Sequence, residues 1–335
     1  MIFIRTDMNE KIATGHVMRC ISIADALKEQ GEEVCFILAD EQAENLIQSS
    51  GYESIILHTV WNDMDSEIPK LLTVIERYKI TRMLIDSYQV TLKYLTELKK
   101  IVQVMYMDDV NMFCYPVDVI VCYANYWSKI YSRQNDESTT FLLGTQYVPL
   151  RKAFWNCKRK QITNEAGRLL LLSGGTDPYD FLGQTLKVLN MQMLQHIDVI
   201  CGRYYTNYKW LYDKYEKNSK VSIYKSVSDV EKYMKDADIA VSAGGTTLYE
   251  LCACGTPTIS YSFADNQLDN VQQFASDGLI DYAGDLRYEN VPKKVIKLIK
   301  QYQKNIELRK QRSQEMQKLV DGKGAIRLAQ KLVEL

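Results

Sequence analysis

The sequence predicts an α/β fold with two doubly wound domains that face a cleft. A chain of 335 residues is more readily built as two domains than as one. Apolar segments of strand length alternate with amphipathic segments of helix length, which is typical of parallel strands joined by crossover helices. The alternation lapses in a polar stretch between residues 149 and 165 and then restarts. We interpret that stretch as a linker between the domains.

The first half of the chain supplies the elements of one doubly wound sheet. Apolar runs predict strands at residues 2–5, 34–38, 83–85, 102–107 and 117–121. Amphipathic segments predict helices at residues 17–30, 41–49 and around 92–99. Gly31 and Gly51 follow the first two helices, as glycine often does where a helix ends.

The second half repeats the pattern. Strands are expected at residues 169–172, 197–200, 221–224, 239–241 and 258–261, and a charged helix at roughly 289–335, broken near 321–324. We therefore expect an N-terminal domain at residues 1–155 and a C-terminal domain at 165–310. A final helix at 311–335 could pack back on the N-terminal domain.

Composition excludes several classes of function. The 41 basic and 42 acidic residues give a net charge of −1, which offers no electrostatic case for a nucleic-acid partner. We find no apolar run of membrane-spanning length and no signal peptide, so we expect a cytoplasmic protein without membrane insertion. The eight cysteines are scattered without ligand spacing, so neither a zinc site nor any other metal site is expected.

The most informative motif runs from Ala243 to Glu250. An apolar strand leads into Gly244-Gly245, and a helix is expected to begin at Thr246 or Thr247. A glycine turn into a helix start offers unpaired N–H groups and the positive end of the helix dipole, which suit a diphosphate. Glu250 follows three residues after Thr247 and could accept hydrogen bonds from a ribose diol.

A second loop before a helix carries a titratable group, His16, after Thr14-Gly15. The helix dipole should keep the imidazole neutral and able to accept a proton, although His16 could instead only cap or pack. Asp86 ends a predicted strand and could orient a base or cap the next helix. Asp108-Asp109 also ends a strand, and we interpret it as a turn.

A third loop, residues 173–177, contains Gly174-Gly175-Thr176 but lacks the lysine of a P-loop. The chain also lacks a Gly-x-Gly-x-x-Gly run, so no dinucleotide and no other cofactor is expected. Gly15, Asp86, Gly174 and Gly244 all follow predicted strands and should converge on the cleft.

Taken together, these motifs resemble those of the two-domain, Rossmann-like GT-B proteins related to the MurG glycosyltransferases. The narrower resemblance is to the pseudaminic-acid pathway UDP-sugar hydrolases and their SpsG-like spore-coat relatives. The segments that carry it extend along the whole chain. They are residues 5–7, 15–20, 86–88, 143–151, 174–178, 244–250, 255–257, 267–270 and 321–325.

The resemblance implies hydrolysis of a UDP-linked diacetamido-trideoxyhexose to free sugar and UDP. His16 would be the base that acts on water, oriented by Asp86 or Asp7. The residues expected to bind the UDP-sugar are Gly15, Arg19, Tyr88, Gly174, Gly175, Thr176, Tyr224, Gly244, Gly245, Thr246, Thr247, Leu248, Glu250, Asp265, Asn266, Gln267 and Asn270. The chain departs from the family at Ala13, where glycine is usual, and at Ser87, where histidine is common.

Two other functions stay open on the sequence alone. One is a GT-B transferase that moves the sugar to an acceptor alcohol, and the other is a catalytically silent module that binds UDP-sugars. A hydrolysing 2-epimerase is disfavoured by the motif around His16.

Overall fold

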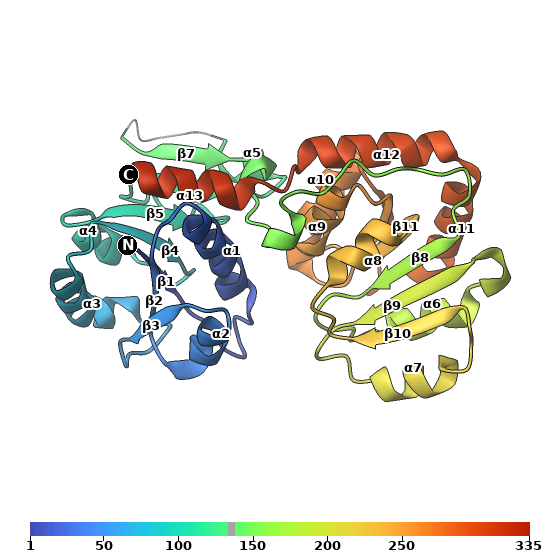
Figure 1. Ribbon diagram of the computed structural model, residues 1–335, viewed down its shortest axis with the longest axis horizontal. Coiled ribbons are helices and arrows are strands. Elements are labelled where there is room, and N and C mark those ends of the chain that lie inside the picture. Colours follow the sequence, from blue (N-terminus) through green and yellow to red (C-terminus); the bar gives the residue numbers. More distant parts are fainter. Residues whose placement is uncertain (133–137) are drawn as a thin grey trace. The chain divides into compact units, whose positions relative to one another are not determined.

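The computed structural model describes residues 1–132 and 138–335. Contacts divide the chain into two compact units: unit 1 comprises Met1–Lys152 and Gly322–Leu335, and unit 2 comprises Ala153–Asp321. Each unit holds one parallel sheet with helices packed against it (Figure 1). The predicted α/β class with two doubly wound sheets is confirmed.

Unit 1 is built on a sheet that has, in the described ranges, seven strands in the order β3-β2-β1-β4-β5-β6-β7. The strands are β1 (Ile2–Thr6), β2 (Val34–Leu38), β3 (Glu53–Ile56), β4 (Arg82–Asp86), β5 (Gln103–Met107), β6 (Val119–Cys122) and β7 (Thr140–Leu143). The helices are α1 (Gly15–Glu29), α2 (Glu44–Ser49), α3 (Met64–Tyr78), α4 (Leu92–Lys99), α5 (Trp127–Ile130) and α13 (Gly324–Glu334), with short 3₁₀ turns η1 (Glu41–Ala43), η2 (Thr145–Tyr147) and η3 (Lys152–Phe154), the last at the boundary with unit 2.

Unit 2 has, in the part of the chain that is described, a six-stranded sheet in the order β10-β9-β8-β11-β12-β13. Its strands are β8 (Arg168–Leu172), β9 (His196–Cys201), β10 (Val221–Lys225), β11 (Ile239–Ala243), β12 (Thr258–Ser262) and β13 (Asp281–Asp285). Its helices are α6 (Phe181–Val188), α7 (Tyr208–Tyr215), α8 (Val230–Asp236), α9 (Thr247–Cys254), α10 (Leu268–Ser276), α11 (Val291–Lys304) and α12 (Ile306–Leu319), with 3₁₀ turns η4 (Met191–Met193) and η5 (Asp265–Gln267).

The central strands are apolar because helices cover both faces of a doubly wound sheet. All five residues of β1 and of β11 are buried, and both contribute to the cores of their units. The edge strand β3 is instead partly exposed, and its sequence is correspondingly mixed.

The single charged helix expected near residues 289–335 is wrong in one respect. It is three helices, because the chain also breaks at Asn305, whose side chain accepts a hydrogen bond from Leu308 N at 2.9 Å and caps α12. Arg309 stabilises the bend: its Nε donates to Tyr302 O at 2.9 Å and the side chain is fully buried.

The last of these helices, α13, belongs to unit 1, where it packs against α1. Helix α13 also packs against the segment around η2, where a Cβ on Gly324 would stand 2.1 Å from Val148 O. Buried side chains of α13, including Leu328 and Leu332, face the unit 1 interior. The C-terminal segment therefore supports the helix that begins at Gly15.

Both sheets have a switch point, where the strand order reverses. In unit 1 the chain moves from β1 to β2 and β3 on one side and from β4 to β5 on the other, so the reversal lies between β1 and β4. In unit 2 it lies between β8 and β11. Ligands of doubly wound sheets bind in the crevice at the carboxyl ends of these strands.

Candidate functional site

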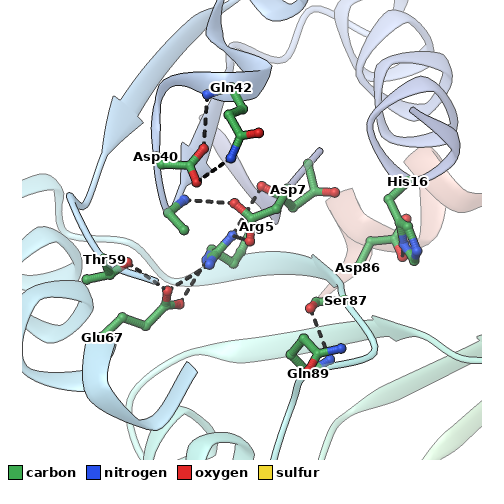
Figure 2. A network of polar contacts seen from close by, with 12 residues as sticks. Arg5, Asp7, His16, Asp40, Gln42, Thr59, Glu67, Asp86, Ser87 and Gln89 are labelled. Carbon is green, nitrogen blue, oxygen red and sulfur yellow. Dashed lines mark hydrogen bonds and ion pairs between the residues drawn. The ribbon is translucent and has the colours of Figure 1, made fainter. Parts of the chain in front are cut away.

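His16 and Asp86 meet at the switch point of unit 1. Asp86 ends β4, and His16 is the second residue of α1, which follows β1. His16 Nδ1 lies 2.7 Å from Asp86 Oδ1, and Figure 2 shows the two side chains facing each other. Both residues are buried. The structure thus joins the two residues that we expected to be catalytic, although they are 70 positions apart in the sequence.

Arg19 holds the carboxylate from the next turn of α1. Its Nε donates to Asp86 Oδ2 at 2.5 Å, its Nη2 donates to Oδ1, and its Nη1 donates to Tyr123 Oη at 2.9 Å. Burial alone would raise the pKa of Asp86, but the Arg19 and His16 groups lower it below its ordinary value. We expected Arg19 to be one of the residues that bind the UDP-sugar; in the structure its donors serve Asp86 and Tyr123.

The ionised carboxylate decides the tautomer of His16. A carboxylate can only accept, so a 2.7 Å contact requires the proton on His16 Nδ1. Arg19 Nη2, 3.0 Å from the same nitrogen, is then a neighbour that shares Oδ1 rather than a donor to the ring. In the neutral ring, Nε2 is then left with its lone pair. His16 is therefore suited to accept a proton.

A small pocket surrounds this pair. It is lined by Asp7, Ile12, His16, Trp61, Asp86, Ser87, Tyr88 and Gln89. The Tyr88 ring meets the His16 ring edge-on, with centroids 4.8 Å apart, and Tyr88 Oη donates to Asp109 Oδ2 at 3.0 Å. Sequence reasoning missed Ile12, Trp61 and Gln89, which lie in loops that carry no motif.

A buried network of ion pairs holds Asp7, one of the residues that line the pocket. Arg5 Nη1 donates to Asp7 Oδ2 at 2.6 Å, while its Nε and Nη2 donate to Glu67 at 2.8 and 2.7 Å. Asp7 Oδ1 also accepts from Ala39 N at 2.8 Å (Figure 2). Arg5 and Glu67 are fully buried. Because Arg5 and the Ala39 amide bond to different oxygens of Asp7, its carboxylate is held in one position. Glu67 was missed because α3 was not predicted.

The loop before α1 explains one departure from the family resemblance. Ala13 has φ +54°, in the left-handed region that favours glycine. Asn9 fixes this turn by accepting hydrogen bonds from Lys11 N and Ile12 N. A glycine would fit this position without strain, which accounts for its frequency there.

The glycine motif of unit 2 lies at the other switch point. Helix α9 begins at Thr247, within the predicted range. Gly244 N donates to Tyr261 O at 2.8 Å, and a Cβ at Gly244 would stand 2.1 Å from Val271 Cγ1. Across the described ranges, no hydrogen bond is found for the N–H groups of Gly245, Thr246 and Thr247. These three amides can serve an anion.

Asn270 shapes this loop from within unit 2. Its Nδ2 donates to Gly244 O at 3.0 Å and to Gly245 O at 3.3 Å, and its Oδ1 accepts from Tyr249 Oη at 3.0 Å. The residue is buried. We expected Asn270 to contact UDP; the structure shows it holding the backbone that carries the free amides.

The loop after β8 lies beside the loop after β11, because the two strands are parallel neighbours with Leu172 opposite Ser242. Gly174, Gly175 and Thr176 are exposed, and Gly174 has φ +76°. Asp177 caps α6 by accepting from Phe181 N at 2.8 Å and Leu182 N at 3.0 Å. Two glycine-bearing loops thus flank the switch point of unit 2.

The other expected contacts are more scattered. Leu248 is fully buried, while Glu250 stands half-buried in the first turn of α9. Asp265 and Asn266 are exposed after β12, and Gln267 accepts from Phe263 N at 3.0 Å. Tyr224 lies on the edge strand β10, with β9 and β8 between it and β11.

Across the parts of the chain that the structure describes, no group of three His, Cys, Asp or Glu side chains could hold a metal ion. Asp108 acts as a turn organiser, accepting from Asn111 N at 2.7 Å and Tyr115 Oη at 2.9 Å. The helices described here are all too short or too polar to cross a membrane.

Residues 169–328 match the glycosyltransferase family 28 C-terminal domain. The chain is also similar in structure to Acinetobacter baumannii MurG, with a TM-score of 0.72 and 12% identity over 100% of this chain and 99% of that one. It has the GT-B fold. Anabaena HepE, solved in complex with UDP and glucose, shares the GT-B fold at a TM-score of 0.61 and 11% identity, with full coverage of both chains.

Two relatives extend the likeness by sequence. An uncharacterized protein of Methanocaldococcus jannaschii is 24% identical over 272 residues, covering 77% of this chain, which spans about half (54%) of that protein. The spore coat polysaccharide biosynthesis protein SpsG of Bacillus subtilis is 23% identical over 338 residues, covering 96% of this chain and 94% of that protein. The chain is thus a glycosyltransferase-like GT-B protein that resembles SpsG along nearly its whole length.

Proposed function

We propose that the chain hydrolyses UDP-2,4-diacetamido-2,4,6-trideoxy-β-L-altropyranose, or a close analogue, to free sugar and UDP. Such a step would serve nonulosonic acid or surface polysaccharide biosynthesis. The observation that carries the proposal is the His16 Nδ1–Asp86 contact of 2.7 Å in a small pocket of unit 1. Similarity to a spore coat polysaccharide biosynthesis protein supports it.

UDP would bind to unit 2. The amides of Gly245, Thr246 and Thr247 would hold the diphosphate at the start of α9, and Glu250 would accept the ribose hydroxyls. Backbone donors of this kind stabilise the charge that develops on the departing UDP. HepE, a protein with the same fold, binds UDP, which supports this assignment.

In the reaction, His16 Nε2 would take a proton from water while the water oxygen bonds to the anomeric carbon. The bond from that carbon to the β-phosphate oxygen would break, and its electron pair would leave with UDP. Asp86 would stabilise the imidazolium that forms, as a carboxylate does for a base of this type. A single displacement predicts inversion at the anomeric carbon.

A transferase is the second candidate, because residues 169–328 match a glycosyltransferase domain. In that case an acceptor hydroxyl would take the place of water. A silent binding module is a third possibility, but a buried His–Asp–Arg arrangement has no evident use in a protein that only binds.

Proton NMR of the purified protein with a panel of UDP-diacetamido-trideoxyhexoses, without acceptor, separates these cases. Free sugar and UDP, with the anomer inverted at first appearance, are expected. UDP binding without free sugar would contradict hydrolysis. Turnover that begins only when an acceptor alcohol is added would favour the transferase.

A further inference from the structure

Two thiols that the proposed reaction does not use lie together near the start of unit 2. Cys157 Sγ is 4.0 Å from Cys254 Sγ. Cys254 is the last residue of α9 and is buried, whereas Cys157 is half-buried and lines a cavity of about 360 Å³. A small solute can therefore reach Cys157, whereas Cys254 is buried behind the cavity lining.

Gln317 of α12 holds the two segments side by side. Its Nε2 donates to Lys158 O and to Ala253 O, both at 3.1 Å, and its Oε1 accepts from Lys160 N at 3.1 Å. Lys158 and Ala253 are the immediate neighbours of Cys157 and Cys254. The distance between the sulfurs is therefore set by the backbone, and it exceeds a disulfide bond by only about 2 Å.

The two thiols differ in acidity. The hydrogen bond with Cys254 lowers the pKa of Cys157 below its ordinary value, burial opposes this shift, and the Lys235 charge adds to it. The same hydrogen bond and burial raise the pKa of Cys254. Cys157 is thus the more acidic thiol of the pair and the one more readily converted to the nucleophilic thiolate.

We propose that Cys157 and Cys254 form a reversible disulfide when the protein meets hydrogen peroxide. The Cys157 thiolate attacks one oxygen of hydrogen peroxide, the O–O bond breaks, and the products are a sulfenic acid and hydroxide, which takes a proton from solvent to become water. The Cys254 sulfur then bonds to the Cys157 sulfur, and the sulfenic oxygen leaves as a second water. Peroxide gains the two electrons that the two thiols lose, and a thiol reductant reverses the reaction.

The bond would join two regions with different tasks. Cys157 lies five residues after Lys152, where the chain passes from unit 1 to unit 2. The same cavity is lined by Val320 and Asp321, where the chain returns. Cys254 closes the helix whose first turn carries the free amides. Oxidation would therefore link the segment just after the unit boundary, which contains Cys157, covalently to the end of α9.

The test treats the reduced full chain with stoichiometric hydrogen peroxide. Thiol titration in denaturant should show the loss of two of the eight thiols, and the intact mass should fall by two hydrogen atoms. Non-reducing peptide mapping should find Cys157 linked to Cys254, and dithiothreitol should restore all thiols. In Cys157→Ser, thiol loss should be at least ~10-fold slower.

Cys254→Ser should instead accumulate a sulfenic acid on Cys157, trapped by dimedone. The matched control is Cys114→Ser, which removes an exposed cysteine and should leave the disulfide unchanged. If Cys157 and Cys254 both survive peroxide doses that oxidise the exposed Cys114, or if mapping links another pair, the proposal is overturned. The peptide map of the wild-type chain decides even where a variant fails to fold. None of these measurements depends on the proposed hydrolysis.

Discussion

The switch points of the two units carry different kinds of polar group. In unit 1 charged side chains converge. Arg19 donates hydrogen bonds to Asp86, Asp86 bonds to His16, and Arg5 donates to Asp7. In unit 2 the corresponding place carries glycines and the free amides of α9. A network of titratable groups can hold or move a proton, whereas backbone donors bind an anion at any pH. On this contrast rests our proposal that unit 1 carries out the proton transfer and unit 2 binds the diphosphate.

Replacing His16 by Ala tests the division of tasks most severely. Turnover should fall by ~10²–10⁴-fold, the usual contribution of a positioned base, while UDP affinity stays within a few-fold. The control is His58→Ala, since the His58 side chain is exposed and its Nδ1 lies 3.1 Å from Glu41 Oε1, outside the pocket of unit 1. Steady-state kinetics and calorimetry with UDP measure both effects. Near wild-type turnover in His16→Ala would remove this residue from the mechanism.

Glu250→Ala tests the nucleotide side. Loss of a charge-assisted hydrogen bond of ~1.5–3 kcal/mol should weaken UDP binding by roughly ten- to a hundred-fold. A 2′,3′-dideoxy analogue should already bind weakly and should barely change with the mutation, because its partner hydroxyls are missing. If calorimetry shows UDP and the analogue losing affinity equally, Glu250 acts only on the helix.

Alanine substitutions at two adjacent glycines test packing and ligand binding separately. A methyl group at Gly244 would collide with Val271, so Gly244→Ala should lose about 1–3 kcal/mol of unfolding free energy. Gly245→Ala meets nothing within 4 Å and should unfold like the wild type while losing UDP affinity. Urea unfolding and calorimetry give the two readouts. Unchanged UDP binding in Gly245→Ala would mean that the diphosphate lies elsewhere.

The carboxylates of the two regions should respond to pH with opposite signs. Asp86 has a lowered pKa, so its contribution to stability is present above the unfolded-state pKa and is lost as pH falls through the folded one. Burial raises the pKa of Asp177 to about 6, although its hydrogen bonds from Leu182 and Phe181 oppose the shift. Its contribution is therefore full below the unfolded-state pKa and is lost as pH rises through 6.

Asp177→Asn should remove this second dependence. The difference in unfolding free energy between pH 4 and pH 7 should change by up to ~2 kcal/mol relative to the wild type. Urea unfolding at several pH values measures it. An unchanged slope would show that Asp177 titrates alike in both states.

Chelation should have the smallest effect. Since no ligand cluster occurs among the residues described, activity should be unchanged by EDTA. Loss of activity that a divalent ion restores would contradict our interpretation of Asp108-Asp109 as a turn.

The sequence allowed the central strands and the glycine loops to be predicted because both are locally encoded. Strands β1, β8 and β11 are buried apolar runs. Two glycines before Thr247 indicate the start of a helix. The edge strands β3 and β7 were missed because their exposed first residues are polar, and β13 was missed because aspartates and a glycine interrupt its apolar pattern. Helix α3 was missed too, since Pro69 lies inside it.

The candidate site shows the same limit. His16 and Asp86 could be proposed from their positions at element ends, but their pairing depends on β1 and β4 being neighbours. The roles of Arg19 and Asn270 could not be foreseen, because hydrogen bonds to Asp86 and to the Gly244 carbonyl arise only once the chain is folded. The sequence shows which polar residues a loop contains. Only the folded structure shows which of them bond to other parts of the protein and which are left to bind a ligand.

The return of α13 to unit 1 has a consequence for how the protein is made. Unit 2 is one continuous stretch, Ala153–Asp321, whereas unit 1 needs residues from Gly322 onward. On the ribosome, unit 2 can therefore complete its core while the face of α1 that α13 covers is still bare. The unit whose synthesis starts first is the last to be finished, so the helix that begins at the proposed catalytic histidine is packed by α13 only after the whole of unit 2 has been synthesised.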